Sequence, residues 1–385
     1  MKKDPYNHKE RYIKWKEGAR NGILDISKEN SDLILQYLYD MERGINIASG
    51  SVRGPRSFIR LNTIKDRLVF FSKKFRSIYG INNITEVSEE QLITLFSDMK
   101  NGNLKKSGGG VYKAVNNYAK AFKAFWHWHQ KVNHKKGIEI KDITIDLDTK
   151  QEKPDWVYLT EEQIKNLCNK SKYEYHVLIM FLFDSGIRAP TELINIKVSD
   201  FYNNFKELNI REEISKTFGR RIKLMLCSKL IANYVKEQKF NPEDYLFNLD
   251  PYRINRYLKR LAKKVLGDKV SPAGQKYSDL TMYDFRHNSC CYWLPRYKSE
   301  SALKYRFGWK ESDKIHYYSE LLGMSDTISE EDMFVDVTKT EIEKRLEKSE
   351  KDKEILNERL TNMEKQMQKV MKLTNLVHEE IKQDN

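Results

Sequence analysis

Apolar residues recur every three or four positions through the first part of the chain, the spacing that places them on one face of an α-helix. This pattern predicts four helices, over residues 27–41, from about 62 onward, from 88 to 101 and over 111–132. The third opens with Ser88-Glu89-Glu90-Gln91, in which the serine and glutamine side chains can each satisfy a backbone group at the helix start. Residues 1–150 are therefore expected to form a helical domain.

The pattern changes at residues 136–157, a charged stretch that contains Pro154 and that we interpret as a linker. A second capping box, Thr160-Glu161-Glu162-Gln163, predicts that a helix begins directly after it. Residues 175–183 are strongly apolar, and they predict a helix at the centre of a second hydrophobic core. The chain is thus expected to fold around at least two cores.

Two short stretches, 208–210 and 222–226, alternate apolar and polar residues and flank the turn-like residues 215–219. Alternation of this kind on both sides of a turn predicts a β-hairpin. Helical spacing resumes at about residue 253. We therefore expect residues 151–330 to form a second domain that is mainly α-helical with a small β-sheet.

The end of the chain has a third pattern. Between Ile342 and Ile381, positions spaced alternately four and three apart are mostly apolar, which is the repeat of a coiled coil. Ser349 and Lys353 interrupt the repeat, so the ordered coil is expected to begin near Leu356. We expect residues 337–385 to be a coiled-coil tail that joins copies of the chain, the alternative being a single helix folded back on the body.

Charge changes the picture by indicating a partner. Lys and Arg number 69 against 55 Asp and Glu, a net charge of +14, which favours a polyanion and above all nucleic acid. The longest strongly apolar run is seven residues, whereas a membrane span needs about 20. The first residues have no apolar signal segment, and the four cysteines have no CxxC spacing. We expect a cytoplasmic protein with reduced cysteines.

Four short motifs contain the candidate chemistry. Arg188 follows a glycine turn after the apolar helix, and an arginine anchored beside a core can bind a phosphate with paired N–H groups. Lys216 lies in the predicted hairpin turn, where it can reach into a groove. The other two motifs are Tyr283-Asp284-Phe285-Arg286-His287 and Gly308-Trp309 followed by Tyr317-Tyr318. Each is ordinary alone, since surface arginines and lysines after turns are common.

Taken together in this order, the motifs resemble the tyrosine recombinase family, which includes the lambda-type phage integrases. Gly186-Ile187-Arg188 with Glu192-Leu193 resembles the first box, with one extra residue before the glutamate. Ser215-Lys216-Thr217 resembles the hairpin lysine turn, and residues 283–287 resemble the His-x-x-Arg-His box. Trp309 stands at the His or Trp position, and Tyr318, nine residues later, matches the nucleophile. The ending Tyr318-Ser-Glu-Leu-Leu-Gly is similar to that of archaeal members.

The resemblance covers residues 155–325 and implies a fold and a reaction. It implies a helical, SAM-like core-binding domain followed by a mixed α/β catalytic domain. Tyr318 would attack a DNA phosphate, Lys216 would protonate the leaving 5′-oxygen, and four further residues would stabilise the phosphate: Arg188, Tyr283, Arg286 and Trp309. The 3′-phosphotyrosyl bond keeps the energy of the phosphodiester, so neither a metal nor a nucleotide cofactor is expected.

One position departs from the family pattern. Tyr283 stands where the family has histidine; its hydroxyl can donate to a phosphate oxygen, but with a pKa near 10 it is a poor base. The neighbouring His287 is expected to play a packing or supporting role. Two alternatives therefore stay open beside a site-specific recombinase or integrase: a type IB topoisomerase-like enzyme that relaxes DNA, and a DNA-binding architectural protein with a decayed site.

Double-stranded DNA is the expected partner, bound by both lobes of a clamp, and a homotetramer on paired sites is the expected assembly. Basic residues of the first domain are the candidates for phosphate contacts: Lys73, Lys74, Arg76, Lys105, Lys106, Lys113, Lys120 and Lys123. His127, His129 and His134 lie beside two tryptophans, and we expect a core or DNA-facing role for them rather than a metal site. The family and its partner suggest a prokaryotic, viral or plasmid protein associated with the nucleoid.

Overall fold

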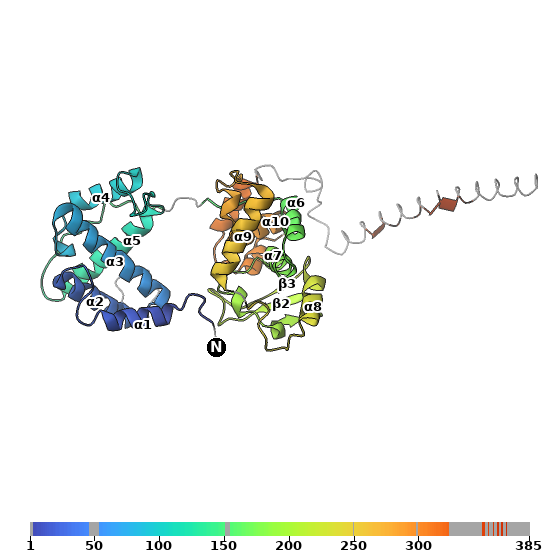
Figure 1. The fold of residues 1–385 in the computed structure, drawn as a ribbon, viewed down its shortest axis with the longest axis horizontal. Helices are drawn as coiled ribbons and strands as arrows, with labels where there is room; N and C mark the ends of the chain where they lie inside the picture. Colours follow the sequence, from blue (N-terminus) through green and yellow to red (C-terminus); the bar gives the residue numbers. More distant parts are fainter. Residues whose placement is uncertain are drawn as a thin grey trace, which may run out of the picture. The chain divides into compact units, whose positions relative to one another are not determined.

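Helices dominate the structure, a computed structural model in which a single small sheet lies in the second half of the chain (Figure 1). It describes residues 3–45, 54–150, 155–248, 250–297 and 299–322, together with scattered tail positions between 349 and 367. The chain divides into two units, residues 1–322 and 323–385. The mainly α-helical fold with a small sheet that the sequence predicted is thereby confirmed.

The first part of the chain is helical. Its elements are α1 (His8–Gly18), α2 (Lys28–Glu42), α3 (Phe58–Tyr79), the 3-10 turn η1 (Ile84–Glu86), α4 (Glu89–Asn101) and α5 (Val115–His134). The capping box of Ser88 and Gln91 forms as predicted. Helix α1 was not predicted, because Tyr12 is its only buried residue and leaves almost no apolar periodicity. Helix α5 begins later than expected because Val111 pairs with Lys105 in a β-bridge.

Aromatic side chains fill the core of this part. Phe71, Phe75, Phe122 and Phe125 are fully buried, and the ring centroids of Phe71 and Phe122 lie 5.1 Å apart. The indole of Trp128 is also buried and donates a hydrogen bond of 2.8 Å to an Asp40 carboxylate oxygen. The aromatic residues of α5 are therefore core residues, as their spacing predicted.

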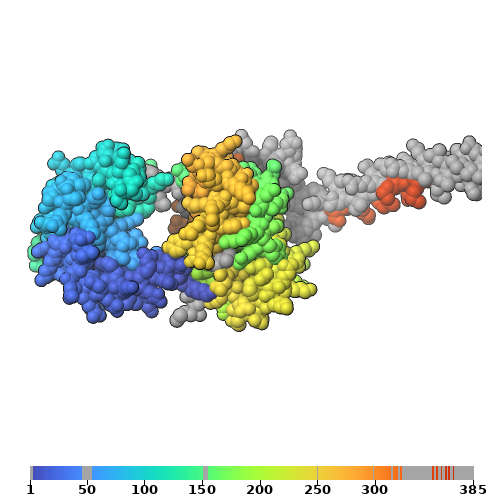
Figure 2. Space-filling view, viewed as in Figure 1, coloured from blue at the N-terminus to red at the C-terminus, as the bar shows by residue number. Residues whose placement is uncertain are grey.

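The second part contains the remaining elements. They are α6 (Glu161–Lys170), α7 (Tyr173–Ser185), η2 (Leu193–Asn195), η3 (Val198–Asp200), β1 (Phe201–Tyr202), β2 (Glu207–Ile210), β3 (Arg220–Lys223), α8 (Ser228–Glu237), α9 (Pro251–Leu266), η4 (Tyr277–Asp279), α10 (Met282–Trp293), η5 (Leu294–Arg296), α11 (Glu300–Phe307) and α12 (Asp313–Leu321). Helix α7 packs on α6, α8 and α10 and buries Val177, Leu178 and Phe181, so the apolar helix is central, as predicted. Helix α9 lies across the face seen in Figure 2.

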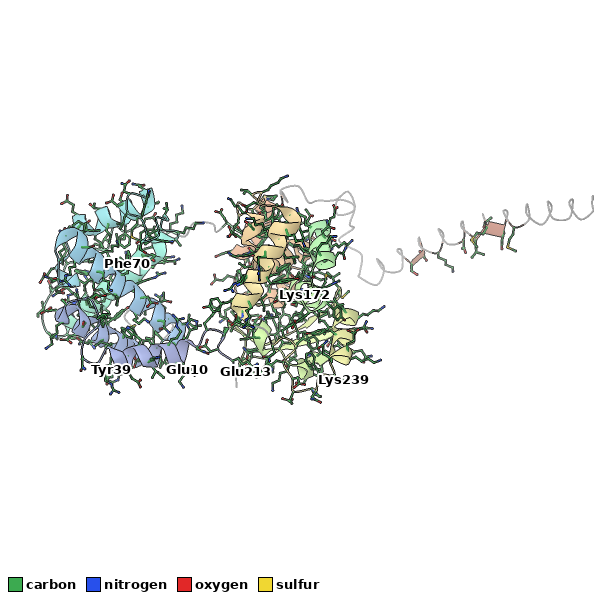
Figure 3. The ribbon with its side chains drawn as sticks, in the orientation of Figure 1. Glu10, Tyr39, Phe70, Lys172, Glu213 and Lys239 are labelled. Carbon is green, nitrogen blue, oxygen red and sulfur yellow. The ribbon has the colours of Figure 1, made fainter. Side chains whose placement is uncertain are left out.

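The sheet is antiparallel, in the order β1-β2-β3. Leu208 lies opposite Ile222, and both are buried, which fixes the register of the predicted hairpin. Strand β3 ends at Lys223, earlier than expected, because the backbone N–H groups of Leu226 and Cys227 donate to an Asp184 carboxylate oxygen instead of to a strand. The connection 211–219 presents a loop, on which Figure 3 labels Glu213.

A separate apolar cluster forms around α10, α11 and α12. It contains Trp156, Cys290, Leu303, Phe307 and Tyr318, all of them buried. Cys290 and the other three cysteines are buried and form no disulfide. The cluster matters for function because it contains the candidate nucleophile and holds it against α10.

The predicted coiled coil at 337–385 lies mostly outside the described residues. The tail positions that are described are helical, and Leu360, Met363 and Met367 among them are exposed. Over the ranges for which the structure gives a conformation, none of the helices combines the length and the apolar character needed to cross a membrane.

Candidate active site

Arg188 is positioned by the turn that ends α7. Gly186 caps the helix with a φ of +59°, and a Cβ there would lie 2.4 Å from the Phe307 ring, so glycine is required. The Arg188 guanidinium donates to Glu192 Oε1 at 3.1 Å and to the Gly308 carbonyl at 2.6 Å. Its side chain is 16% exposed, so one edge of a well-held cation can still meet a ligand.

Glu192 connects three parts of the site. Its buried carboxylate accepts from Arg188, from both Nη atoms of Arg220 at 3.1 and 2.9 Å, and from the Ser215 hydroxyl at 3.4 Å. Burial by itself favours the neutral acid, but hydrogen bonds and charge from Arg220, with a smaller effect from Arg188, keep the pKa of Glu192 below its usual value. The carboxylate therefore stays ionised and fixes two arginines and the hairpin loop.

Arg286 is held from the opposite side, by α10. Its two Nη atoms donate to the carbonyls of Gly186 and Phe307, both at 2.6 Å, and the residue is 4% exposed. Burial and the nearby charge of Arg188 lower the pKa of Arg286 to about 10, so it is a cation at neutral pH. Because Phe307 and Gly308 are adjacent, the two guanidinium groups bind neighbouring carbonyls.

The hairpin loop reaches the same place. The Thr217 hydroxyl donates to the Gly308 carbonyl at 2.9 Å, the same oxygen that accepts from Arg188. Ser215 bonds to Glu192, so both neighbours of Lys216 are anchored on the arginine network. Lys216 itself is exposed between them. The backbone thus holds an exposed cation beside two that are fixed by hydrogen bonds.

Tyr318 lies on α12 against this network. Its ring stacks on Trp309 with centroids 5.9 Å apart and planes at 11°, and Trp309 lies 5.8 Å from the Arg286 guanidinium. The residue is 4% exposed, and burial raises the pKa of its hydroxyl well above the usual value. The hydroxyl is 2.6 Å from Nδ1 of His287. The adjacent Tyr317 accepts instead from the Trp156 indole at 2.6 Å.

Three solved structures share this arrangement of elements. The Tn1549 transposon integrase in complex with transposon right-end DNA aligns with a TM-score of 0.55 at 15% identity, over 78% of this chain and 96% of its own. The XerH site-specific recombinase bound to a palindromic difH substrate gives 0.53 at 14%, over 83% and 96%. A lambda integrase dimer bound to a COC′ core site gives 0.53 at 12%, over 76% and 77%.

The chain has the tyrosine recombinase fold. No protein-family model and no curated protein sequence matches it. Within this fold, Arg188, Arg286, Trp309 and Tyr318 are brought together, and Lys216 lies on the loop that is anchored beside them.

Tyr283 lies at the edge of this candidate site. It stands in the first turn of α10, is 49% exposed, and its ring meets the His287 ring edge-to-face at a centroid distance of 5.1 Å.

Arg220 and the His287–Tyr318 hydrogen bond were not foreseen from the sequence. The only sequence signal for either was the position of His287 one turn after Tyr283 on a helix.

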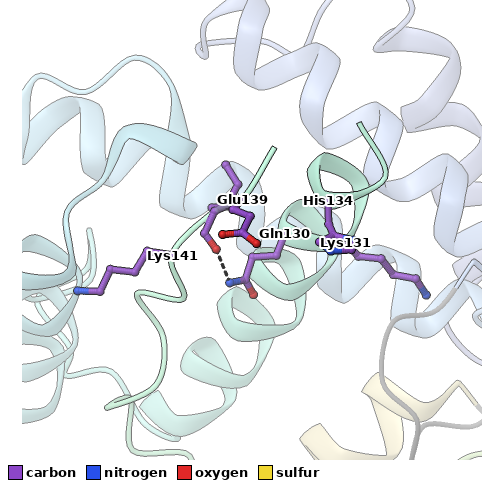
Figure 4. A pocket seen from close by; sticks show the side chains of 6 residues that line it. Gln130, Lys131, His134, Glu139 and Lys141 are labelled. Atoms are coloured by element: carbon purple, nitrogen blue, oxygen red, sulfur yellow. Dashed lines mark hydrogen bonds between the residues drawn. The ribbon is translucent and has the colours of Figure 1, made fainter. Parts of the chain in front are cut away.

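A hollow of about 640 Å³ lies elsewhere, at the end of α5 (Figure 4). Gln130, Lys131, His134, Glu139 and Lys141 line it, and the Gln130 amide donates to the Ile140 carbonyl at 2.9 Å. It contains none of the candidate catalytic residues, so we do not assign the reaction to it. His127 pairs with Asp142 at 3.0 Å, which gives one of the α5 histidines a structural role.

Proposed function

We propose that this protein is a site-specific DNA recombinase or integrase that cleaves and rejoins strands through a 3′-phosphotyrosyl intermediate. One observation carries the proposal. Two arginines and the lysine loop all bond to the adjacent carbonyls of Phe307 and Gly308, and the next residue, Trp309, stacks on the ring of Tyr318. The fold supports it, because the three similar structures are of recombinases or integrases bound to DNA.

The chemistry follows from the charges. The Tyr318 oxygen bonds to a backbone phosphorus while the bond from phosphorus to the 5′-oxygen breaks. Negative charge grows on the non-bridging oxygens, and Arg188 and Arg286 stabilise it with N–H donors that are already held in place. Trp309 can add its indole N–H and Tyr283 its hydroxyl.

Lys216 is the proposed acid. Its two neighbours in the loop, Ser215 and Thr217, are bonded to Glu192 and Gly308, so its exposed ammonium is held where it can reach the departing 5′-oxygen and protonate it. The phosphotyrosyl bond retains the phosphodiester energy, so a 5′-hydroxyl of another strand can reverse the step. Cleavage and rejoining therefore balance with no external energy source.

A basic face on α9 supplies a surface for the DNA backbone. The buried side of this helix contains Ile254, Leu258 and Leu261, and no acidic residue occurs along it. The exposed side is cationic, with Arg253, Arg256, Arg260, Lys263 and Lys264, and with Lys259, which pairs with Asp279 at 3.3 Å. Of the first-domain candidates, Lys123 instead donates to the Thr144 carbonyl and Lys73 pairs with Asp25. We place the main phosphate contacts of the catalytic domain on α9.

The reaction is tested by trapping the covalent intermediate. The full chain is incubated with a pool of nicked duplexes of random sequence, from which a short fragment diffuses away after cleavage and leaves the adduct stranded. We expect a DNA adduct that survives denaturing electrophoresis, is lost in Tyr318→Phe and remains in Tyr317→Phe, because Tyr317 is bonded to Trp156. An adduct in Tyr318→Phe that is lost in Tyr317→Phe would move the nucleophile by one residue.

The same experiment separates the alternatives. DNA binding with no adduct from the unmodified protein would favour an architectural protein with a decayed site. An adduct accompanied only by relaxation of a supercoiled circle, and never by joining of two sites, would favour a topoisomerase. We propose that joining requires a tetramer on paired sites, and that the tail assists its assembly.

A further inference from the structure

We infer that His287 accepts the phenolic proton of Tyr318 during cleavage and returns it during rejoining. This role rests on the proposed function and names the base, which that function leaves open. It assigns the proton transfer to the second histidine position of the box, His287, which lies one helical turn along α10 from Tyr283.

The two reacting groups are already in contact. Nδ1 of His287 and the Tyr318 hydroxyl are 2.6 Å apart, within the distance required of a general base. The His287 ring stacks on Trp156 with centroids 4.8 Å apart and planes at 26°, and the Tyr318 ring stacks on Trp309. Each ring is therefore held by stacking on an indole, and the hydrogen bond between His287 and Tyr318 is formed before DNA binds.

A base is needed at this position. A phenol has a pKa near 10, and burial raises the pKa of Tyr318 further, so the hydroxyl is protonated at neutral pH. An imidazole ring nitrogen is a proton acceptor in its neutral form, and Nδ1 of His287 is the ring nitrogen that lies at the Tyr318 hydroxyl. Tyr283 cannot take this part, since its own hydroxyl is a phenol and its ring is 49% exposed.

The step balances with the side chains of the site. The bond from Tyr318 Oη to phosphorus forms, the bond from phosphorus to the 5′-oxygen breaks, the phenolic proton moves to Nδ1 of His287, and a proton from Lys216 Nζ moves to the leaving oxygen. Rejoining runs each transfer backwards. Arg286 directly precedes His287 on α10 and is a buried cation, and its charge favours the ionised form of Tyr318.

The rival role for His287 is positioning alone, and an asparagine separates the two. In His287→Asn the side-chain carbonyl can still accept a hydrogen bond from Tyr318, but it cannot take up a proton. Single-turnover cleavage of a duplex recovered from the random pool is measured for the unmodified protein, His287→Asn and His287→Ala. His134→Asn is the matched control, because His134 is an exposed histidine of α5 outside the site.

We expect both His287 variants to form the adduct at least about 100-fold more slowly, the usual contribution of a general base, with unchanged DNA affinity. A second substrate carries sulfur in place of the bridging 5′-oxygen, a leaving group that needs no acid. It should restore Lys216→Ala and leave the His287 variants slow, while added imidazole should restore His287→Ala.

The outcomes keep this inference apart from the proposed function. Wild-type rates in His287→Asn would overturn the role as base and leave only positioning. Restoration of the His287 variants by the sulfur substrate would assign His287 to the leaving group, which also overturns the inference. If the unmodified protein forms no adduct, the proposed function fails first. Should His287→Ala unfold, shown by its thermal midpoint, the asparagine variant decides alone.

Discussion

The buried carboxylate of Glu192 offers the sharpest test of how the site is held. Its side chain is 1% exposed, that of Arg220 is 0% exposed and that of Arg188 is 16% exposed. Replacing it as Glu192→Gln keeps the shape and removes the charge. The amide nitrogen then faces a guanidinium N–H, donor against donor, and two cations stay close together with no anion between them.

Removing one member of a buried ion pair costs about 3–5 kcal/mol, because the desolvated partner is left uncompensated. We expect Glu192→Gln to lose that amount of unfolding free energy. Urea unfolding followed by tryptophan fluorescence measures it, since Trp293 and Trp309 report on this part of the chain. The matched control is Glu243→Gln. The Glu243 side chain is 76% exposed and pairs with Lys197 at 2.6 Å, so its replacement should change the free energy of unfolding little.

The loss should also depend on pH with a definite sign. Because the pKa of Glu192 is lowered in the folded state, the carboxylate stabilises the fold fully above its unfolded value, about 4.3. That contribution disappears as the pH falls through the lower folded pKa. The difference in unfolding free energy between the unmodified protein and Glu192→Gln should therefore become smaller in acid. A loss below about 1 kcal/mol at pH 7, the range of an exposed pair, would refute the reasoning. So would a gap that widens as the pH falls.

Two further predictions test the backbone anchor and the DNA surface. A Cβ at Gly308 would lie 3.1 Å from Arg188 Nη1 at a φ of +61°, so Gly308→Ala should displace that guanidinium and slow adduct formation by about 10-fold or more in the single-turnover assay. An adduct rate equal to that of the unmodified protein would contradict this. Arg256→Gln on α9 should reduce the slope of log affinity against log salt by about 1, and an unchanged slope would remove Arg256 from the phosphate contacts.

Elements with local signals could be predicted from the sequence. The capping boxes at Ser88 and Thr160 each place a hydrogen bond within one helical turn, so four residues suffice to mark the helix start. Helix α1 and strand β1 have no comparable signal. The first buries a single side chain, and the second is two residues long and exists because β2 pairs with it. Helix α1 is held by its packing against α3, and β1 by the strand that follows it after a short turn.

The candidate site also has a part that could be predicted from the sequence and a part that could not. Arg188, Lys216, Arg286 and Tyr318 are each ordinary alone, and it is their order and spacing along the chain that mark them as a set. The groups that hold them are mostly backbone carbonyls, of Gly186, Phe307 and Gly308, which residue types do not reveal. Arg220 is equally hidden: an arginine followed by Arg221 in a basic strand gives no sign of burial, yet its neighbour in space is Glu192.

The departure at Tyr283 takes on a different meaning in three dimensions. Counting along the chain assigns the position of the second-box histidine to a tyrosine, which by itself suggests a weakened or decayed site. On a helix, residues four apart share a face, and His287 stands one turn on from Tyr283 with its ring 5.1 Å away. The box therefore loses its first histidine but keeps its second, and the imidazole of His287 contacts the hydroxyl of Tyr318 directly. The sequence motif shows which side chains are present, and the geometry of α10 shows that His287, not Tyr283, contacts the hydroxyl of Tyr318.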